Sequence, residues 1–353
     1  MKRSALMGMV AGLLLPAAVA AQAGTTTIGG QWYLTYQSGK SGAATFNRFG
    51  IERGYINIRH TLNERWSGRI TPDVTTDASG DAKVRLKYAY ADLKLSDAGF
   101  LTSPHVELGM VHRPWLDYEE HIDEYRVQGT MYMERVGLFN SADFGVTFFA
   151  LLGGRMDEAY RSEVSSAYPG RRGSIAVGVY NGGGYHAVEN NENKSLEGRL
   201  SIRPLPDALP GLQLTYLGIL GKGNTAASPD WTVSTLFASL EGRAYVLTGQ
   251  LYRGDGNSKG SVVDEDGIAL ALDGWSLFGE WKLHGPGLSV IGRYDRFDAG
   301  PASTDDRTER LIGGLAYHIG GASKILADFD VLTRNGFDTT DSRTFKLALE
   351  YAF

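Results

Sequence analysis

Apolar and polar side chains alternate at every second position along most of this chain. In residues 65–74, for example, Trp66, Ile70 and Val74 fall on one parity, and the other parity holds only charged or hydroxyl side chains. The same period recurs in 195–203 and in many other segments. A helix would instead repeat its apolar residues every three or four positions. The chain is therefore predicted to be built from β-strands with one apolar and one polar face.

Sixteen such strands can be traced, and their connections alternate between short and long. The predicted strands cover 25–36, 50–62, 65–75, 83–95, 104–112, 143–152, 173–181, 195–203, 211–221, 231–241, 243–253, 268–284, 287–297, 308–319, 322–333 and 343–353. Short turns are predicted at 63–64, near Gly242, at 284–287 and at 319–322, and longer polar links at 38–49, 181–194, 254–266 and 299–308. Segment 153–172 falls among the short turns but is too long for them. It is either an elaborated turn or a sign that the strand count is wrong there.

These features predict an all-β protein: a transmembrane, antiparallel, up-and-down β-barrel of about sixteen strands, with long extracellular loops and short periplasmic turns. Most of the predicted strands are near the ~9–11 residues that a tilted strand needs to cross a bilayer. Arg or Lys on the lipid face costs roughly 2–4 kcal/mol at mid-bilayer, so the charged face must line the interior. A barrel of this size encloses an aqueous channel rather than a dry core.

The first residues have the features of a secretory signal peptide. Lys2 and Arg3 precede a short apolar run, and the small residues that follow form an A-x-A cleavage pattern ending at Ala23. We therefore expect 1–23 to be removed and 24–353 to form a single barrel domain. The sequence has no cysteine, which excludes disulfides and thiolate metal sites. After the signal peptide, no apolar run approaches the ~18 residues of a transmembrane helix.

Several short stretches resemble the phosphate-selective porin O/P type and related sixteen-stranded general porins of Gram-negative outer membranes. They are KVRLKYAYADLKL (83–95), VELGMVHRPW (106–115), DFGVTFF (143–149), SIAVGVYNG (174–182) and VIGRYDRFD (290–298), together with Phe353. The resemblance implies a homotrimer in the cell outer membrane of a Gram-negative bacterium, surrounded by outer-membrane lipid. It also implies passive diffusion of solutes and a third extracellular loop folded into the lumen. Phe353 would be the signal that the barrel-assembly machinery recognises.

The longest polar link, 113–142, lies where the resemblance places the lumen-folded loop. The segment is acidic, with basic residues nearby. Its candidate constriction residues are Arg113, Asp117, Glu119, Glu120, Asp123, Glu124 and Arg126. We expect this loop to narrow the pore, and the alternative is an ordinary surface loop.

Basic residues on the predicted inner face are the candidates for lining the pore. They are Arg53, Arg59, Arg69, Arg85, Lys87, Arg199 and Arg293. Those on the second to fourth strands would form a basic row, and such rows select for anions and phosphates. However, the formal net charge is −5 and the candidate loop is acidic. The sequence therefore leaves open a mild anion preference, a cation preference or no strong preference, and it assigns phosphate specificity to no particular residue.

The function predicted from the sequence is that of an outer-membrane porin, a water-filled channel for passive diffusion of small hydrophilic solutes or ions. We predict no enzymatic activity, because no Ser-centred or phosphate-binding motif accompanies the histidines, and His121 with Asp123 is a chance pair in an acidic loop. No cofactor or metal site is indicated, since acidic loops such as 263–267 lack EF-hand spacing. Nucleic-acid binding is not indicated either, because the basic residues alternate along strands. A structural or adhesive barrel is the main alternative, and a barrel enzyme is a further one.

Overall fold

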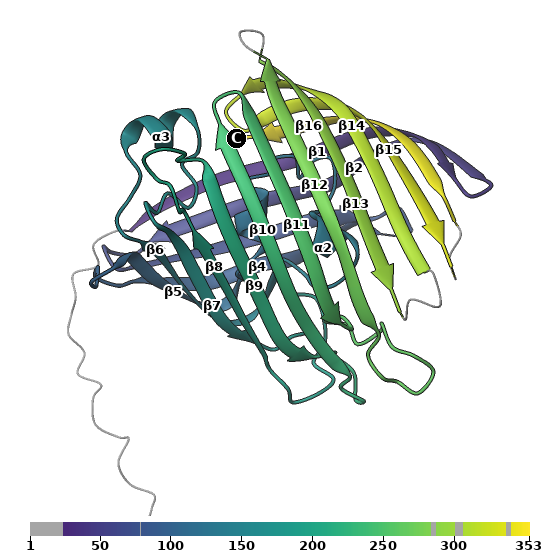
Figure 1. The fold of residues 1–353 in the computed structure, drawn as a ribbon, viewed down its shortest axis with the longest axis horizontal. Coiled ribbons are helices and arrows are strands. Elements are labelled where there is room, and N and C mark those ends of the chain that lie inside the picture. The colour runs from purple at the N-terminus through teal and green to yellow at the C-terminus, as the bar shows by residue number, and fades with distance from the viewer. Residues whose placement is uncertain (1–23, 78, 284–286, 301–305, 337–339) are drawn as a thin grey trace, which may run out of the picture.

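The computed structural model describes residues 24–353 except 78, 284–286, 301–305 and 337–339. The predicted signal peptide therefore lies outside the described residues, as does most of the predicted turn at 284–287. The described chain forms a closed barrel of sixteen antiparallel strands, in which each strand pairs with its sequence neighbours (Figure 1). The predicted fold class is confirmed. Among the described residues, no helix has the length and apolar character needed to cross a membrane.

The strands agree closely with the predicted ones. They are β1 (Thr25–Ser41), β2 (Ala44–Thr61), β3 (Trp66–Thr76), β4 (Ala82–Lys94), β5 (Leu101–His112), β6 (Ala142–Leu152), β7 (Gly173–Tyr180), β8 (Ser195–Ile202), β9 (Leu212–Lys222), β10 (Asp230–Gly242), β11 (Tyr245–Asp255), β12 (Ala271–Leu283), β13 (Leu288–Ala299), β14 (Asp306–Gly320), β15 (Ser323–Asn335) and β16 (Ser342–Ala352). Three short helices lie in the links: α1 (Leu116–Glu120), α2 (Tyr132–Arg135) and α3 (Glu158–Glu163).

The barrel closes where β16 pairs with β1. The pairing runs from Gln31 opposite Ala352 to Ser41 opposite Ser342. Beyond it, the backbones of Gly30 and Phe353 exchange two further hydrogen bonds of 3.0 and 3.1 Å. The strand predicted at 343–353 therefore leaves no unpaired sheet edge, as expected for a barrel.

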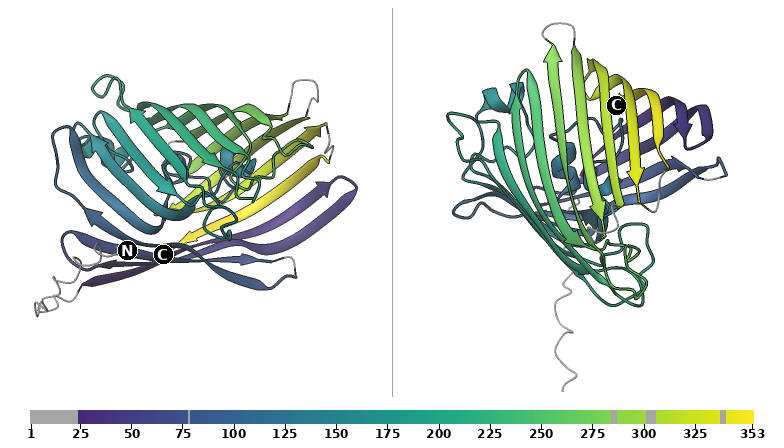
Figure 2. Two further views of the ribbon diagram at one scale, coloured as in Figure 1. Left: turned by 90° about the horizontal axis from the view of Figure 1, so that it is seen from below. Right: turned by 45° about the vertical axis from the view of Figure 1, so that its right-hand side comes forward.

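The link predicted at 38–49 is instead strand. β1 and β2 continue as a hairpin, and only Gly42 and Ala43 separate them. This segment is rich in glycine and small polar residues, a composition typical of loops, but Lys40 still pairs with Thr45 in register. Gly42 has a φ of +56°, which a glycine adopts without strain, so the chain can turn back sharply there. In Figure 2 this purple hairpin reaches beyond the ends of most other strands.

The remaining links alternate between the two ends of the barrel. We call the end that carries 113–141, 181–194 and 256–270 the loop end, and the opposite end the turn end. At the turn end, segment 153–172 joins β6 to β7, contains α3 and adds no strand to the barrel. It is an elaborated turn, and we call it the long turn. Segment 113–141, with α1 and α2, lies inside the barrel and is called the inner loop (Figure 1).

The structure shows which parity of each strand faces the barrel interior and which faces outward. In β10, apolar side chains occur on both parities, so the period alone does not decide whether Leu236 or its neighbours Thr235 and Phe237 face outward. The structure places Leu236 outward, 59% exposed, whereas Thr235 and Phe237 are buried inside. Both parities are apolar here because the inner loop packs on the inward one.

Two β-bulges interrupt the period near the basic residues. Pro72 in β3 has no amide hydrogen to donate to a neighbouring strand, and the β3–β4 register shifts between Thr71 and Pro72. Opposite this shift, Lys87 is the extra residue of β4 and is buried in the interior together with the adjacent Tyr88. A second shift, in the β1–β2 pairing, leaves Glu52 as the extra residue of β2. Bulges of this kind re-aim side chains.

Candidate functional site

The inner loop is fastened to the barrel wall where it begins. Arg113 follows β5, and its guanidinium donates to Glu197 through Nε at 3.0 Å and through Nη2 at 2.5 Å. Both side chains are fully buried. Arg199, two residues further along β8, donates to the backbone oxygen of Pro114 at 2.8 Å. Because bidentate Arg–carboxylate pairs are among the strongest polar contacts, the inner loop is held inside the barrel from its first residues.

One side of the inner loop is apolar and packs against the inward-facing side chains of β8–β12. Trp115 contacts Phe237 edge-to-face, with ring centroids 5.4 Å apart. The hydroxyl of Tyr118 lies 2.9 Å from the hydroxyls of Ser201 and Thr215. These side chains belong to, or border, a continuous cluster of buried apolar residues. Protein therefore fills this half of the barrel interior.

The inner loop then crosses the lumen and binds the strands beyond. Asp123 accepts a hydrogen bond from Arg293 Nη1 at 3.2 Å, and the Tyr125 hydroxyl donates to Glu280 at 2.6 Å. Lys324 of β15 donates from Nζ to a backbone oxygen of the inner loop at 2.5 Å. The inner loop is thus attached to β8, β9, β12, β13 and β15, and also to β16, where Lys346 Nζ donates to the Gln128 backbone oxygen at 2.8 Å. The arginine side chains on β2–β4 stay partly or largely exposed, and we call the space beside them the open part of the lumen.

The predicted constriction residues divide into two groups. Asp117, Glu120 and Glu124 are partly or largely exposed and can face water in the lumen. The other predicted residues are buried against the wall or within the loop: Arg113, Glu119, Asp123 and Arg126. The sequence could not separate the groups, because α1 and the turns that follow it have no fixed two-residue period.

The basic row on β2–β4 faces the open part of the lumen. Arg59 of β2 lies directly opposite Arg69 of β3. Arg69 donates to Asn57 Oδ1 at 2.7 Å and to Thr71 Oγ1 at 2.9 Å, and its Nη1 lies 3.2 Å from His112 Nε2. Within the part of the chain that the structure describes, neither arginine forms an ion pair with a carboxylate. Like charges placed directly opposite each other repel, so an anion between them would relieve this repulsion.

The rest of the basic row is partly neutralised. Arg53 and Arg85 both donate to Oδ2 of Asp73, at 2.7 and 2.8 Å. Lys87, which the β4 bulge brings inside, has its Nζ 4.6 Å from the centre of the Tyr55 ring. The five basic residues predicted for this row are therefore brought together, with one buried carboxylate among them.

Lys87, which is only 6% exposed, and two other predicted pore-lining residues require a correction, because they are buried. Arg199 and Arg293 point into the barrel, but they are only 1% and 7% exposed. The Arg199 guanidinium stacks on the Tyr118 ring at 4.1 Å, and Arg293 is held between Asp123 and Asp295. Strand phase correctly gave their inward direction, but it could not show that the inner loop covers them.

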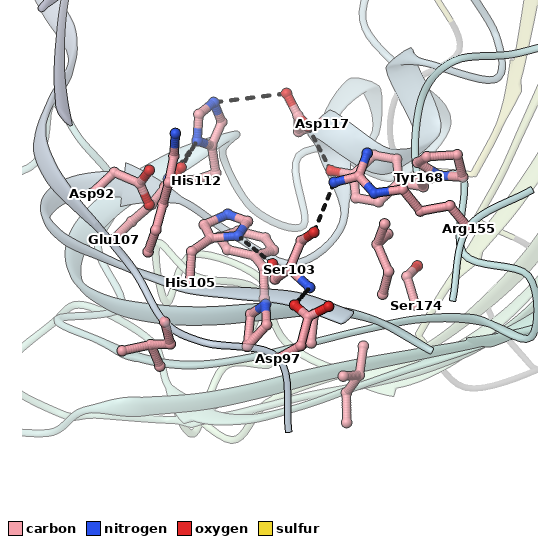
Figure 3. Close-up of a pocket in the computed structure, with 18 of the residues that line it drawn as sticks. Asp92, Asp97, Ser103, His105, Glu107, His112, Asp117, Arg155, Tyr168 and Ser174 are labelled. Atoms are coloured by element: carbon pink, nitrogen blue, oxygen red, sulfur yellow. Dashed lines mark hydrogen bonds and ion pairs between the residues drawn. The ribbon is translucent and has the colours of Figure 1, made fainter. Parts of the chain in front are cut away.

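Asp117 lies where three elements meet (Figure 3). His112 Nε2, at the end of β5, is 3.7 Å from Asp117 Oδ1, and His121 Nδ1 is 3.5 Å from Oδ2. From the turn end, the Tyr168 hydroxyl of the long turn donates to Asp117 Oδ2 at 2.5 Å. His112, Asp117 and Tyr168 border a cavity of about 610 Å³ that is also lined by residues of β4–β6 and the long turn. The pairing of His121 with Asp123, considered from the sequence, is replaced by contact with Asp117.

The surroundings of the inner loop determine which of its carboxyl groups are charged. Burial alone would raise the pKa of Asp117, but His121, His112 and the Tyr168 hydroxyl hold that pKa well below its usual range. Burial raises the pKa of Glu119 to about 8, although Trp115 Nε1 donates to its carboxylate at 2.7 Å. Asp117 is therefore charged near pH 7 and Glu119 is largely neutral, so the loop is less negative than its sequence indicates.

Three residues of this site were not singled out from the sequence. Asp73 is one acidic residue among many on strands, and no local pattern marks it. His112 ends a predicted strand next to the loop, which is a weak signal. The unusual length of 153–172 was the one available signal for Tyr168. Among the described residues, no three His, Asp or Glu side chains form a group that could hold a metal ion.

Comparison with known proteins identifies relatives by structure alone. No protein-family model and no curated protein matches the sequence. The outer-membrane channel DcaP of Acinetobacter baumannii is 12% identical, with a TM-score of 0.65 over 94% of this chain and 97% of that one. An anion-selective porin from Comamonas acidovorans is 12% identical, with a TM-score of 0.63 over 94% and 100%. OmpF of Salmonella typhi is 11% identical, with a TM-score of 0.61 over 93% and 98%. The chain therefore has the fold of Gram-negative outer-membrane porins.

Proposed function

We propose that this protein is a porin of a Gram-negative outer membrane that lets small hydrophilic solutes and ions diffuse passively through its lumen. The inward-facing arginines on β2–β4, which stay partly or largely exposed beside the inner loop, are the observation that carries this proposal. A sixteen-stranded barrel is wide enough for an aqueous channel, and the inner loop narrows this one from the opposite side. In this assignment the loop end is extracellular and the turn end periplasmic.

We further propose a mild preference for anions. On the inner loop, the charge of Glu120 is offset by Arg126 at 3.2 Å, and Glu119 is largely protonated near neutral pH. On the opposite wall, Arg59 and Arg69 have no carboxylate partner among the described residues. Asp117 and Glu124 stay negative, and Asp117 acts on both arginines, so the expected preference is mild. Its direction follows from the row of arginines, because such rows select for anions. One structural neighbour is named as an anion-selective porin, which agrees with this direction.

The proposal is tested by reversal potentials of the purified protein in planar bilayers under a KCl gradient. We expect the wild type to conduct and to favour chloride modestly. The double variant Arg59→Gln and Arg69→Gln should lose that preference, because it removes both unpaired positive charges. Glu124→Gln should strengthen the preference, since it removes an exposed negative charge. A cation preference in the wild type would contradict the proposed selectivity, and absence of conductance would contradict the proposed function.

We also propose that the protein assembles as a homotrimer. The porin fold is compatible with the homotrimer that the sequence resemblance implies, and one neighbour of 12% identity, OmpT of Vibrio cholerae, is described in a trimer form. Exposed apolar side chains cover the outer face of the strands, as contact with outer-membrane lipid requires. Recognition of Phe353 by the barrel-assembly machinery stays a prediction.

A further inference from the structure

The long turn carries a strained tyrosine at the place where it reaches the inner loop. Tyr168 has a φ of +45°, in the left-handed region that residues other than glycine rarely adopt. Such a conformation is unfavourable and persists only where the surrounding structure enforces it. Neighbouring contacts should therefore show what holds this residue in place.

Side chains from the inner loop and from β8 surround Tyr168. Its hydroxyl donates to Asp117 at 2.5 Å. Its ring contacts the Tyr118 ring edge-to-face at 5.1 Å and the His121 ring at 6.0 Å, and the Arg199 guanidinium lies 5.0 Å from its centre. The long turn thus contacts the side of the inner loop that carries Asp117. It does so from the turn end, whereas the inner loop enters the barrel from the loop end.

The barrel wall fixes the long turn independently of the inner loop. Arg203 of the wall donates to the Gly170 backbone oxygen at 3.2 Å and to the Tyr160 hydroxyl at 3.1 Å. Asp157 caps α3 by accepting from the Tyr160 backbone amide at 2.8 Å. Tyr168 therefore belongs to a segment that has anchors of its own besides the bond to Asp117.

We propose that the long turn sets the ion selectivity of the constriction, with Tyr168 as the positioning residue that fixes the Asp117 carboxylate in the lumen. This inference rests on the proposed pore function. The charged and titratable groups that interact with Asp117 come from several elements: Arg59 of β2, Arg69 of β3, Tyr88 and Tyr90 of β4, His112 of β5, His121 of the inner loop, Arg199 of β8 and Tyr168 of the long turn. Among them, Tyr168 is a neutral donor attached at the turn end, so its removal changes the hydrogen bonding of Asp117 without changing any charge.

Tyr168→Phe tests the proposal, and Tyr160→Phe is the matched control. Both variants remove one hydroxyl from the long turn, but the Tyr160 hydroxyl bonds to Arg203 rather than to Asp117. Reversal potentials are measured as the pH is lowered, and Asp117→Asn identifies the part of the titration that belongs to Asp117. Since a hydrogen bond to a charged group favours ionisation, losing it should move the Asp117 part of the titration up by about one pH unit. Tyr160→Phe should leave the titration unchanged.

Hydrogen exchange of the inner-loop amides, measured on the same proteins, gives a second readout that does not depend on channel conductance. We expect segment 116–124 to exchange about tenfold faster in Tyr168→Phe than in Tyr160→Phe, because its bond to the long turn is lost. Equal exchange in the two variants, or an unshifted titration in a conducting Tyr168→Phe channel, would overturn the proposal. If the wild type failed to conduct, the proposed porin function would be wrong. Faster exchange in Tyr168→Phe would then show that Tyr168 holds the inner loop for another purpose, and the proposed control of selectivity would be wrong as well.

Discussion

At the scale of single residues, the buried Glu119 of the inner loop should make the free energy of unfolding depend on pH in a defined direction. Burial raises the pKa of Glu119 from 4.5 to about 8, so between these values the folded protein holds a proton that the unfolded chain releases. The free energy of unfolding should therefore fall as pH rises through this window, by at most about 5 kcal/mol. Urea unfolding of the barrel in detergent, followed by tryptophan fluorescence at several pH values, measures this.

Glu119→Gln supplies the control for that titration. The amide keeps the shape of the protonated acid and accepts the hydrogen bond from Trp115, but it cannot ionise. The variant should lose most of the pH dependence and should be more stable than the wild type at pH 8. An identical pH dependence in both proteins would show that Glu119 is not protonated in the folded state.

At the scale of elements, the inner loop is expected to limit the current. Deleting 117–126 removes the acidic face that borders the open passage, together with the Tyr118 anchor. The single-channel conductance should rise several-fold, because water then fills space that the loop occupies. Deleting 264–267, an exposed turn of another long link, is the matched control and should leave conductance unchanged. Unchanged conductance after both deletions would show that the inner loop is not the constriction.

The strands could be predicted because each one repeats the period of two over about ten residues, which chance rarely produces. The bulges could not, because an extra residue such as Lys87 is recognised only once its partner strand is known. The phase of β10 was undecided for a related reason. Thr235 and Phe237 face the barrel interior, yet Phe237 is apolar because it contacts the inner loop rather than water.

The candidate site was predicted only in part, because its geometry depends on contacts between distant segments. The basic row followed from strand adjacency alone, so its members were correctly grouped. The burial of Arg199 and Glu119 depends on how the inner loop folds, and no local pattern encodes that path. Tyr168 was beyond reach for the same reason, since 51 positions separate it from Asp117.

At the scale of the whole molecule, the barrel interior has two unlike halves. The buried apolar cluster that contains the inner loop lies mainly against β9–β12, with single members on β1, β2 and β13–β16, and the arginines of β2–β4 stay partly exposed. The route for solutes should therefore follow one wall rather than the barrel axis. In the proposed channel, ions would pass between the basic row and the inner loop, and this passage would give a wide barrel its proposed selectivity.

The one-wall route can be mapped with engineered thiols, since the sequence contains no cysteine. Ser67 of β3 faces inward and is partly exposed on the open side of the lumen. Thr235 of β10 also faces inward, but it is fully buried beneath the inner loop, with its Oγ1 3.3 Å from Met133 Sδ. A charged, thiol-specific reagent should modify Ser67→Cys and reduce its current. It should modify Thr235→Cys at least about tenfold more slowly, because reaction there requires local opening of the inner loop.

Ser234→Cys, which faces outward, serves as the lipid-side control and should not change the current. Equal rates at Ser67→Cys and Thr235→Cys would show that water occupies both halves, and the one-wall route would then be wrong.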